Sequence, residues 1–266
     1  MGRRSVRIAL GVQYDGSDFQ GWQAQRPEVR TVQSSLEQAI STVADHPIRL
    51  ICAGRTDAGV HGIGQVVHFD TTANRPERAW VLGGNSNLPS DISLSWACPV
   101  AEDFHARFSA LARRYRYLIL DRSDRSALWR KRATWCRRPL DAERMQIAGR
   151  ALLGEHDFSS FRAAECQARQ PVREIRELTV RRADGGVVLE VEANAFLHHM
   201  VRNIAGVLMA IGVGERPIEW AREVLAQCDR TQGGVTAPAD GLYLVTVRYP
   251  ERFGLPVAFA TAPGFI

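Results

Sequence analysis

Alternation of apolar and polar positions predicts four strands in the first hundred residues. Val6–Tyr14 alternates along its whole length and ends at Asp15-Gly16, a pair typical of turns. In Gln65–Asp70, the even-numbered and odd-numbered side chains fall on opposite faces. Shorter runs predict the other strands, at Ile48–Cys52 and Ile92–Ala97.

Two helices are predicted between these strands. Thr31 can cap the first, "TVQSSLEQAISTVADH", in which apolar residues recur at helical spacing. The second, "ERAWVLGGNSNLP", is predicted to be a short helix that breaks at Gly83-Gly84. The first half of the chain therefore has the element order β-α-β-β-α-β.

The second half repeats this order. Its helices are predicted over "DAERMQIAGRALLG", capped by Asp141 and stopped at Gly154, over "FLHHMVRNIAGVLMAIG", and over Ile218–Cys228. Its strands are predicted at Arg114–Leu120, Val172–Arg181, Val187–Ala193 and Leu242–Val247.

Two β-α-β-β-α-β units predict an α+β protein made of two ferredoxin-like, RRM-like halves. Each half would hold an antiparallel sheet, and the two would flank a central basic catalytic cleft. We expect the halves at residues 1–106 and 107–266. The repeat is one of pattern, because the two halves share no visible sequence similarity.

Composition is ordinary for a soluble globular protein, with 45% hydrophobic and 24% charged residues among 266. No apolar run approaches the ~18 residues that span a bilayer, and no signal peptide is recognisable, so we expect a cytoplasmic protein. The five cysteines are scattered and form no C-x-x-C pair, which argues against a disulfide framework and a zinc ribbon.

Positive charge is concentrated in one segment. The net charge is +5, but Arg107–Arg150 holds twelve arginines and one lysine against four acidic residues, a local surplus of +9. Aromatic residues are interleaved with these cations, which favours a face that binds a polyanion. The alternative is a solvated surface whose arginines reflect a GC-rich coding bias.

The stretch "GRTDAGVHG" is too polar and too rich in glycine for a strand or helix interior, so it predicts a loop between two buried strands. Its carboxylate, Asp57, can serve as a nucleophile, a general base, a metal ligand or a turn cap. Arg55 lies two residues earlier, and Thr56 and Gly59 tighten the loop.

A metal site around Asp57 would have to use His61 and His68, which are seven residues apart and lack the spacing of helical ligands. Phosphate-binding and nucleophile-elbow motifs are also absent from the sequence. ATP, NAD and acyl-transfer chemistry therefore lack their usual signatures, and we predict neither a metal nor a cofactor.

On the strand in "ARRYRYLIL", Tyr115 and Tyr117 face one way, and Arg114 and Arg116 face the other. This is either a half-buried strand with a solvated basic side or an aromatic platform for a nucleic-acid base flanked by phosphate-binding arginines.

The helix in "FLHHMVRN" carries Arg202 beside its apolar stripe, where a guanidinium needs a carboxylate partner. His198 and His199 are adjacent, so a helix would point them in different directions. We therefore expect packing or capping roles for them, not a joint metal site.

Six blocks of sequence, in this order, resemble the bacterial tRNA pseudouridine synthase A family from about Val6 to Pro250. The GRTDAGVH block is the most specific. The blocks are "AGRTDAGVHGIGQVVHF", "NLP", "DFHARFSALARRYRYLI", "FRAAECQARQPVREI", "ANAFLHHMVRN" and "DGLYL".

The resemblance implies an isomerase that converts uridine to pseudouridine at positions 38, 39 and 40 of the tRNA anticodon stem-loop. It implies a homodimer that binds tRNA and uses no metal or nucleotide cofactor. The aspartate of the GRTDAG block, here Asp57, would be the nucleophile. Attack at C6 of uracil, attack at C1′ of ribose and proton removal at C2′ all remain open.

The resemblance also implies roles for other residues. Tyr115 would pack against the target base, and Arg202 would pair with the catalytic aspartate. Arg55 would fill the space that the flipped nucleotide leaves. Leu242 or Leu244 would line the base pocket, and we favour Leu244.

Two other classes of protein remain as alternatives. A non-catalytic RNA-binding protein built on RRM-like halves would explain the basic segment and the fold, but it does not need Asp57 or Arg202. A metal-dependent nuclease would need metal ligands that the sequence does not supply.

Overall fold

The computed structural model describes residues 5–26, 28–166 and 168–256, which fold into two units of mixed α and β structure. The first unit comprises the chain up to Leu111 and the segment that starts at Leu244, and the second comprises Ala112–Tyr243. This division differs from the expected halves, 1–106 and 107–266, because the described residues from Leu244 to Pro256 belong to the first unit.

The first unit is built on an antiparallel sheet. Its strands lie in the order β4-β1-β3-β10, and β2 adds a short pairing to β3. Pairing of β1 with β3 places Leu10 opposite Val67, and both are fully buried. The strands are β1 (Val6–Tyr14), β2 (Ile51–Cys52), β3 (His61–Thr71), β4 (Ile92–Val100) and β10 (Leu242–Arg248), of which Leu244–Arg248 belongs to this unit.

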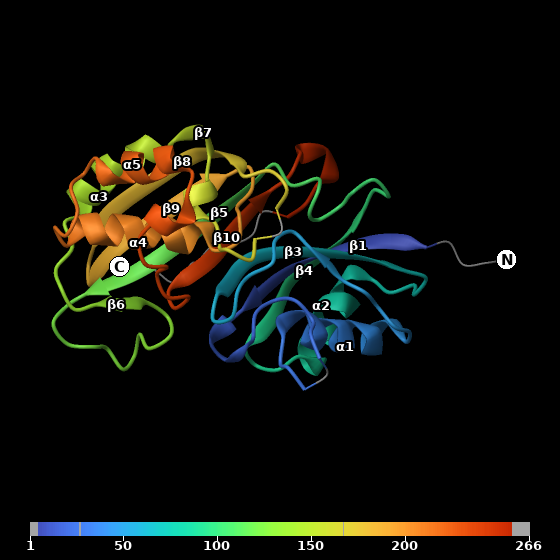
Figure 1. Ribbon diagram of the computed structural model, residues 1–266. Coiled ribbons are helices and arrows are strands. Elements are labelled where there is room, and N and C mark those ends of the chain that lie inside the picture. Colours follow the sequence, from blue (N-terminus) through green and yellow to red (C-terminus); the bar gives the residue numbers. More distant parts are fainter. Residues whose placement is uncertain (1–4, 27, 167, 257–266) are drawn as a thin grey trace. The chain divides into compact units, whose positions relative to one another are not determined.

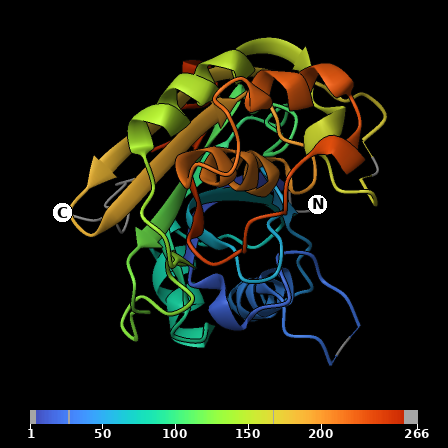
Figure 2. The same ribbon diagram turned by 60° about the vertical axis from the view of Figure 1, so that its left-hand side comes forward.

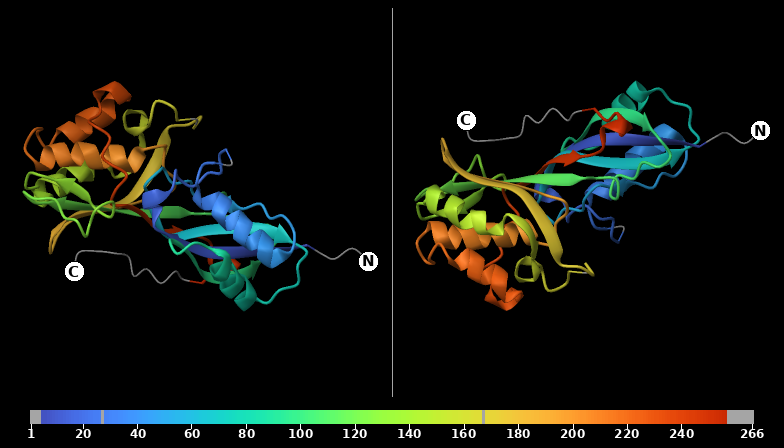
Figure 3. Two further views of the ribbon diagram at one scale, coloured as in Figure 1. Left: turned by 90° about the horizontal axis from the view of Figure 1, so that it is seen from below. Right: turned by 90° about the horizontal axis from the view of Figure 1, so that it is seen from above.

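Two helices, α1 (Val32–Ala44) and α2 (Glu77–Asn87), cover one face of this sheet (Figure 1 and Figure 3). Between helices and sheet lies a core in which Leu36, Ile40 and Trp80 have no exposed surface. Burial of this apolar area is the main stabilising contribution to the unit.

The first helix begins as its sequence predicts, because the Thr31 hydroxyl accepts a hydrogen bond from the Ser34 amide at 3.3 Å. The predicted break in the second helix is wrong. Gly83 and Gly84 remain helical, and a Cβ on Gly84 would lie 2.4 Å from Cδ1 of Leu94. That glycine therefore permits close packing of the helix on β4 instead of ending the helix.

In the second unit the strands lie in the order β5-β9-β8-β7 with antiparallel pairing, and β6 is parallel to β5. The helices gather on one side of the long strands β8 and β9 (Figure 2). The strands are β5 (Ala112–Asp121), β6 (Thr134–Cys136), β7 (Gly154–Asp157), β8 (Val172–Ala183) and β9 (Gly186–Ala193), and the helices are α3 (Ala142–Gly149), α4 (Met200–Gly212) and α5 (Trp220–Gln227).

The sequence predicted these long elements but not β6 and β7, which are three and four residues long. The helix α4 starts at Met200, later than predicted, because His199 has a left-handed backbone with φ of 62°. Among the described residues, no helix is both long enough and apolar enough to span a membrane.

Short 3₁₀ turns connect several elements. They lie at Gly16–Asp18, Arg150–Leu152, Ser159–Phe161, Arg230–Gln232 and Glu251–Phe253. The tail beyond Pro250, for which the sequence predicts no element, is described as far as Pro256.

Candidate active site

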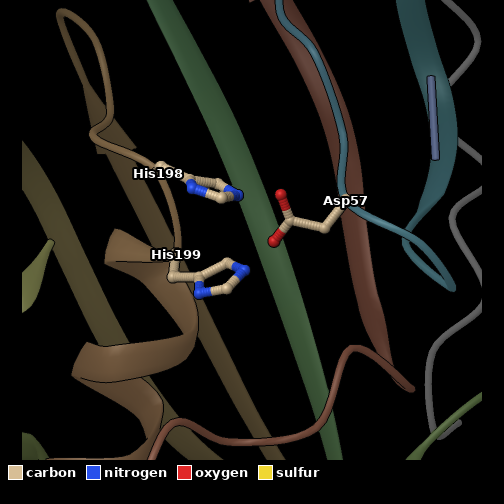
Figure 4. Close-up of side chains that lie close together, drawn as sticks. All are labelled: Asp57, His198 and His199. Atoms are coloured by element: carbon tan, nitrogen blue, oxygen red, sulfur yellow. The ribbon is translucent and has the colours of Figure 1, made fainter. Parts of the chain in front are cut away.

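Asp57 lies on the loop between β2 and β3 of the first unit, as the sequence predicts (Figure 4). Its side chain is half-buried. The preceding residue, Thr56, is buried and held from two directions. Its carbonyl oxygen accepts a hydrogen bond from the Trp22 amide at 2.9 Å, and its hydroxyl lies 2.9 Å from the hydroxyl of Tyr14. The backbone that presents the carboxylate is therefore fixed by the core of the unit.

Two glycines bring the turn after β1 against this loop. A Cβ on Gly16 would lie 2.0 Å from the Val60 carbonyl oxygen, and one on Gly21 would lie 2.9 Å from the Thr56 carbonyl oxygen. Gly21 also has φ of 88°, which other residues adopt at a cost. This turn was not predicted from the sequence to be part of the site, although its spaced glycines were a visible signal.

His61 and His68, which the sequence suggested as possible metal ligands beside Asp57, accept hydrogen bonds from backbone amides instead. Nδ1 of His61 accepts a hydrogen bond from the Gly16 amide at 3.0 Å, and Nδ1 of His68 accepts one from the Ala106 amide at 3.1 Å. Burial, with the nearby charge of Arg7, lowers the pKa of His68 to about 4. Both rings therefore serve the structure of the first unit.

Arg55, two residues before Asp57, is exposed. Its side chain makes no hydrogen bond or ion pair within the part of the chain that the structure describes. Its guanidinium is therefore accessible to solvent.

Tyr115 lies on β5 of the second unit and is 8% exposed. Its ring packs edge-on against Phe196, with the ring centroids 5.0 Å apart. The neighbouring residue on the same strand face, Tyr117, is fully buried, and its hydroxyl donates to the Pro238 carbonyl oxygen at 2.8 Å. Burial raises the pKa of Tyr117 far above its usual value.

Arg114 and Arg116 are not unpaired cations. The cross-strand register sets them opposite Glu192 and Glu190 of β9. Nε of Arg114 lies 3.0 Å from Glu192, and an Nη atom of Arg116 lies 2.6 Å from Glu190. Arg114 also pairs with Glu177. An RNA phosphate would have to compete with these carboxylates.

Arg202 lies in the first turn of α4 and is half-buried. Its Nε donates to the Ala237 carbonyl oxygen at 2.9 Å, and the Ala237 amide donates to the Arg202 carbonyl oxygen at 3.1 Å. The segment before the last strand therefore orients this guanidinium. The two candidate leucines on that strand, Leu242 and Leu244, are both buried, and Leu244 has no exposed surface.

His198 and His199 do not diverge as a helix would require. They precede α4, and their rings lie beside each other with centroids 4.1 Å apart (Figure 4). The prediction that they point in different directions is wrong because the helix begins one residue after them.

A family model described as tRNA pseudouridine synthase matches residues 11–109 and 148–250. Proteins named tRNA pseudouridine synthase A from Nitrosococcus oceani and Coxiella burnetii are 60% and 59% identical over 251 residues, which cover 94% of this chain and 96% of each relative. The protein of that name from an Enterobacter strain is 57% identical and covers the same share of this chain and 92% of its own.

Proposed function

The chain belongs to the tRNA pseudouridine synthase family, and on this basis we propose that it isomerises uridine to pseudouridine in tRNA with Asp57 as the nucleophile. In this reaction the N1–C1′ bond breaks, the uracil turns, and a C5–C1′ bond forms. No oxidant, reductant or phosphate leaving group is consumed. The positions proposed are 38, 39 and 40 of the anticodon stem-loop, which the sequence resemblance implies.

The observation that supports Asp57 most directly is the attachment of its loop to the core through Thr56. A reacting group must be held close to its productive geometry, since a misplacement of about 1 Å can cost on the order of a hundredfold in rate. A loop whose residue before the carboxylate is held by two hydrogen bonds meets that requirement. The same carboxylate can attack C6 or C1′, or remove the proton at C2′.

Tyr115 and Arg55 are proposed to handle the extruded nucleotide. Taking a base out of a stem costs a few kcal/mol. Stacking on an aromatic ring returns ~1–3 kcal/mol, and Tyr115 is the proposed platform. Arg55, whose side chain is exposed, is proposed to occupy the gap in the stem and offset part of the remaining cost.

Arg202 is proposed as the counter-charge of the reacting carboxylate, because a guanidinium nearby favours the ionised form of a carboxyl group. Leu244 is proposed as the apolar contact of the base. Arg114 and Arg116 are proposed to strengthen the basic surface that meets the RNA backbone, in addition to pairing with glutamates.

Incubation with unmodified tRNA in the presence of EDTA, followed by mapping of pseudouridine, tests the proposal. The wild-type protein is expected to form pseudouridine despite the chelator. Asp57→Asn is expected to form none while it still binds tRNA. Asp184→Asn is the matched control, because Asp184 is exposed in the turn between β8 and β9.

The other outcomes identify the alternatives. Binding without any pseudouridine in the wild-type protein would indicate an RNA-binding protein that does not catalyse. Cleavage of tRNA that EDTA abolishes would indicate a nuclease. Full activity of Asp57→Asn would remove the aspartate from the mechanism.

We also propose that the protein acts as a homodimer in the cytoplasm, as the resemblance implies. Analytical ultracentrifugation at micromolar concentration is expected to give a species of about twice the 29.6 kDa chain mass. Cell fractionation is expected to recover the protein with the soluble tRNA pool.

A further inference from the structure

Two arginines line a cavity of about 250 Å³ in the second unit. Arg162 follows the 3₁₀ turn Ser159–Phe161, and Arg230 begins the turn Arg230–Gln232. These two turns pack against each other and appear side by side in Figure 2 as the yellow and orange-red turns. Neither arginine belongs to the residues already given a role.

Neither guanidinium has a carboxylate partner among the described residues. Arg230 donates to two neutral acceptors, Oδ1 of Asn203 at 3.2 Å and the Thr236 hydroxyl at 2.9 Å. The side chain of Arg162 makes no hydrogen bond within that part of the chain. A guanidinium has five N–H donors, so most donors of these two half-buried cations remain for water or an oxyanion.

Asn203 holds Arg230 in place. It is 2% exposed, and its Nδ2 donates to the Phe161 carbonyl oxygen at 2.7 Å. Its Oδ1 accepts from the Thr236 hydroxyl at 2.7 Å as well as from Arg230. One buried amide thus joins both turns that form the cavity, so the position of the guanidinium is built into the fold.

The cavity wall is also tied to the residues that precede α4. The Ala163 amide donates to the His198 carbonyl oxygen at 2.8 Å. Asn203 follows Arg202 directly, and the backbone of Arg202 is hydrogen-bonded to Ala237. A ligand in the cavity would therefore be held at a fixed place relative to the start of α4.

The charge of the cavity suits a singly charged anion. Asp229 also lines it, with its carboxylate accepting hydrogen bonds from the amide and hydroxyl of Thr231 at 2.9 and 2.8 Å. Two guanidinium groups and one carboxylate leave a net charge of +1. A phosphodiester carries one negative charge and presents acceptor oxygens that guanidinium groups match.

We propose that Arg162 and Arg230 bind a phosphodiester of the anticodon stem-loop and so position the RNA backbone beside the start of α4. This inference rests on the proposed function, because that function supplies the RNA. Free inorganic phosphate offers similar oxygens, and the experiment below separates the two sources.

Arg162→Gln is the informative variant, because its side chain makes no hydrogen bond in the described part of the chain and the fold is expected to survive, as thermal unfolding will show. It is expected to bind tRNA about tenfold more weakly, with a slope of log K against log salt that is smaller by roughly 0.7–0.9. Arg222→Gln removes the same charge from an exposed site on α5 and is the matched control. Asp229→Asn is expected to strengthen binding.

A set of synthetic stem-loops, each with one neutral methylphosphonate linkage, identifies the phosphate. At one position the neutral linkage is expected to weaken binding to the wild-type protein about tenfold and to leave binding to Arg162→Gln unchanged. Additive effects at every position would overturn the proposal. The proposal would also be overturned if inorganic phosphate, added at constant ionic strength, abolished the difference in stem-loop affinity between the wild-type protein and Arg162→Gln.

Pseudouridine formation is measured separately on the same wild-type preparation. Coupling at one phosphate without pseudouridine would support the phosphate site and contradict the proposed function. Pseudouridine formation without coupling at any phosphate would support the proposed function and contradict the phosphate site.

Discussion

The hydroxyl group of Tyr14 lies 2.9 Å from the hydroxyl group of Thr56 in the interior of the first unit. Tyr14 ends the first strand, and Thr56 immediately precedes Asp57. The contact therefore joins the first strand of the sheet to the loop that carries the proposed nucleophile. Because both side chains are buried, loss of either hydroxyl leaves the other without this partner.

Tyr14→Phe is expected to lower kcat while leaving tRNA affinity nearly unchanged, because it loosens the Asp57 loop without touching the RNA. It should also cost about 1–3 kcal/mol of stability. Tyr249→Phe is the control, since it removes a comparable bond, from its hydroxyl to the Ala106 carbonyl oxygen at 2.6 Å. Equal kcat values for the two variants would show that the Tyr14 contact has only a structural role.

Gly21→Ala is expected to reduce both stability and activity. The new methyl group would meet the Thr56 carbonyl oxygen at 2.9 Å, and φ of 88° adds a strain of about 1–2 kcal/mol. Gly214→Ala has similar strain at φ of 79° but nothing within 4 Å of the added Cβ. Urea unfolding should therefore show that both variants are destabilised. Single-turnover rates should show a loss of activity in Gly21→Ala alone.

Tyr115→Phe is expected to retain tRNA affinity, because the phenyl ring keeps the packing against Phe196 and the stacking surface. Tyr115→Leu should weaken binding by roughly tenfold through loss of stacking. Binding isotherms and single-turnover rates separate the two effects. A large rate loss in Tyr115→Phe would indicate that the hydroxyl transfers a proton.

Arg114→Gln is expected to destabilise the protein by about 3 kcal/mol, because it leaves the nearly buried carboxylate of Glu192 without its cross-strand partner. The double variant Arg114→Gln, Glu192→Gln should recover much of that loss in urea unfolding. The salt dependence of tRNA binding is measured on both proteins. A reduced slope in the stable double variant would support a phosphate contact, and an unchanged slope would assign Arg114 to structure alone.

Stability is expected to fall as the pH drops from about 6.5 towards 4. Burial keeps the pKa of His68 near 4 in the folded protein, whereas the unfolded chain takes up the proton near 6.5. The unfolded state therefore binds more protons in that window, which costs about 1–3 kcal/mol. His68→Asn keeps an acceptor for the Ala106 amide and removes the titration. If the stability of His68→Asn depended on pH as that of the wild-type protein does, the effect would come from another titrating group.

Elements whose signals are local were predictable from the sequence. The strand Val6–Tyr14 has the predicted bounds, and the helix after Thr31 begins at the predicted cap. The Gly83-Gly84 pair misled the prediction, because the reason for Gly84 is the side chain of Leu94 on another element. Such a contact leaves no trace in the residues around the glycine.

Charge pairs between neighbouring strands also could not be predicted from the order of residues along the chain. The +9 surplus of Arg107–Arg150 is partly neutralised by Glu190 and Glu192, which lie outside that segment and face it only in the folded sheet. The buried amide of Asn203 was missed for the same reason, since its partners come from two distant turns.

Among the described residues β10 is the last strand in the sequence, so it can pair with β3 only late in translation. β10 pairs beside β3, and the Val245 carbonyl oxygen lies so close to Gly64 that a Cβ there would be 2.2 Å away. While the ribosome translates the second unit, this edge of β3 lacks its neighbour, and exposed strand edges invite association with other chains. Premature termination before Leu244 would therefore leave the Asp57-bearing unit unfinished, although all its other strands had already been made.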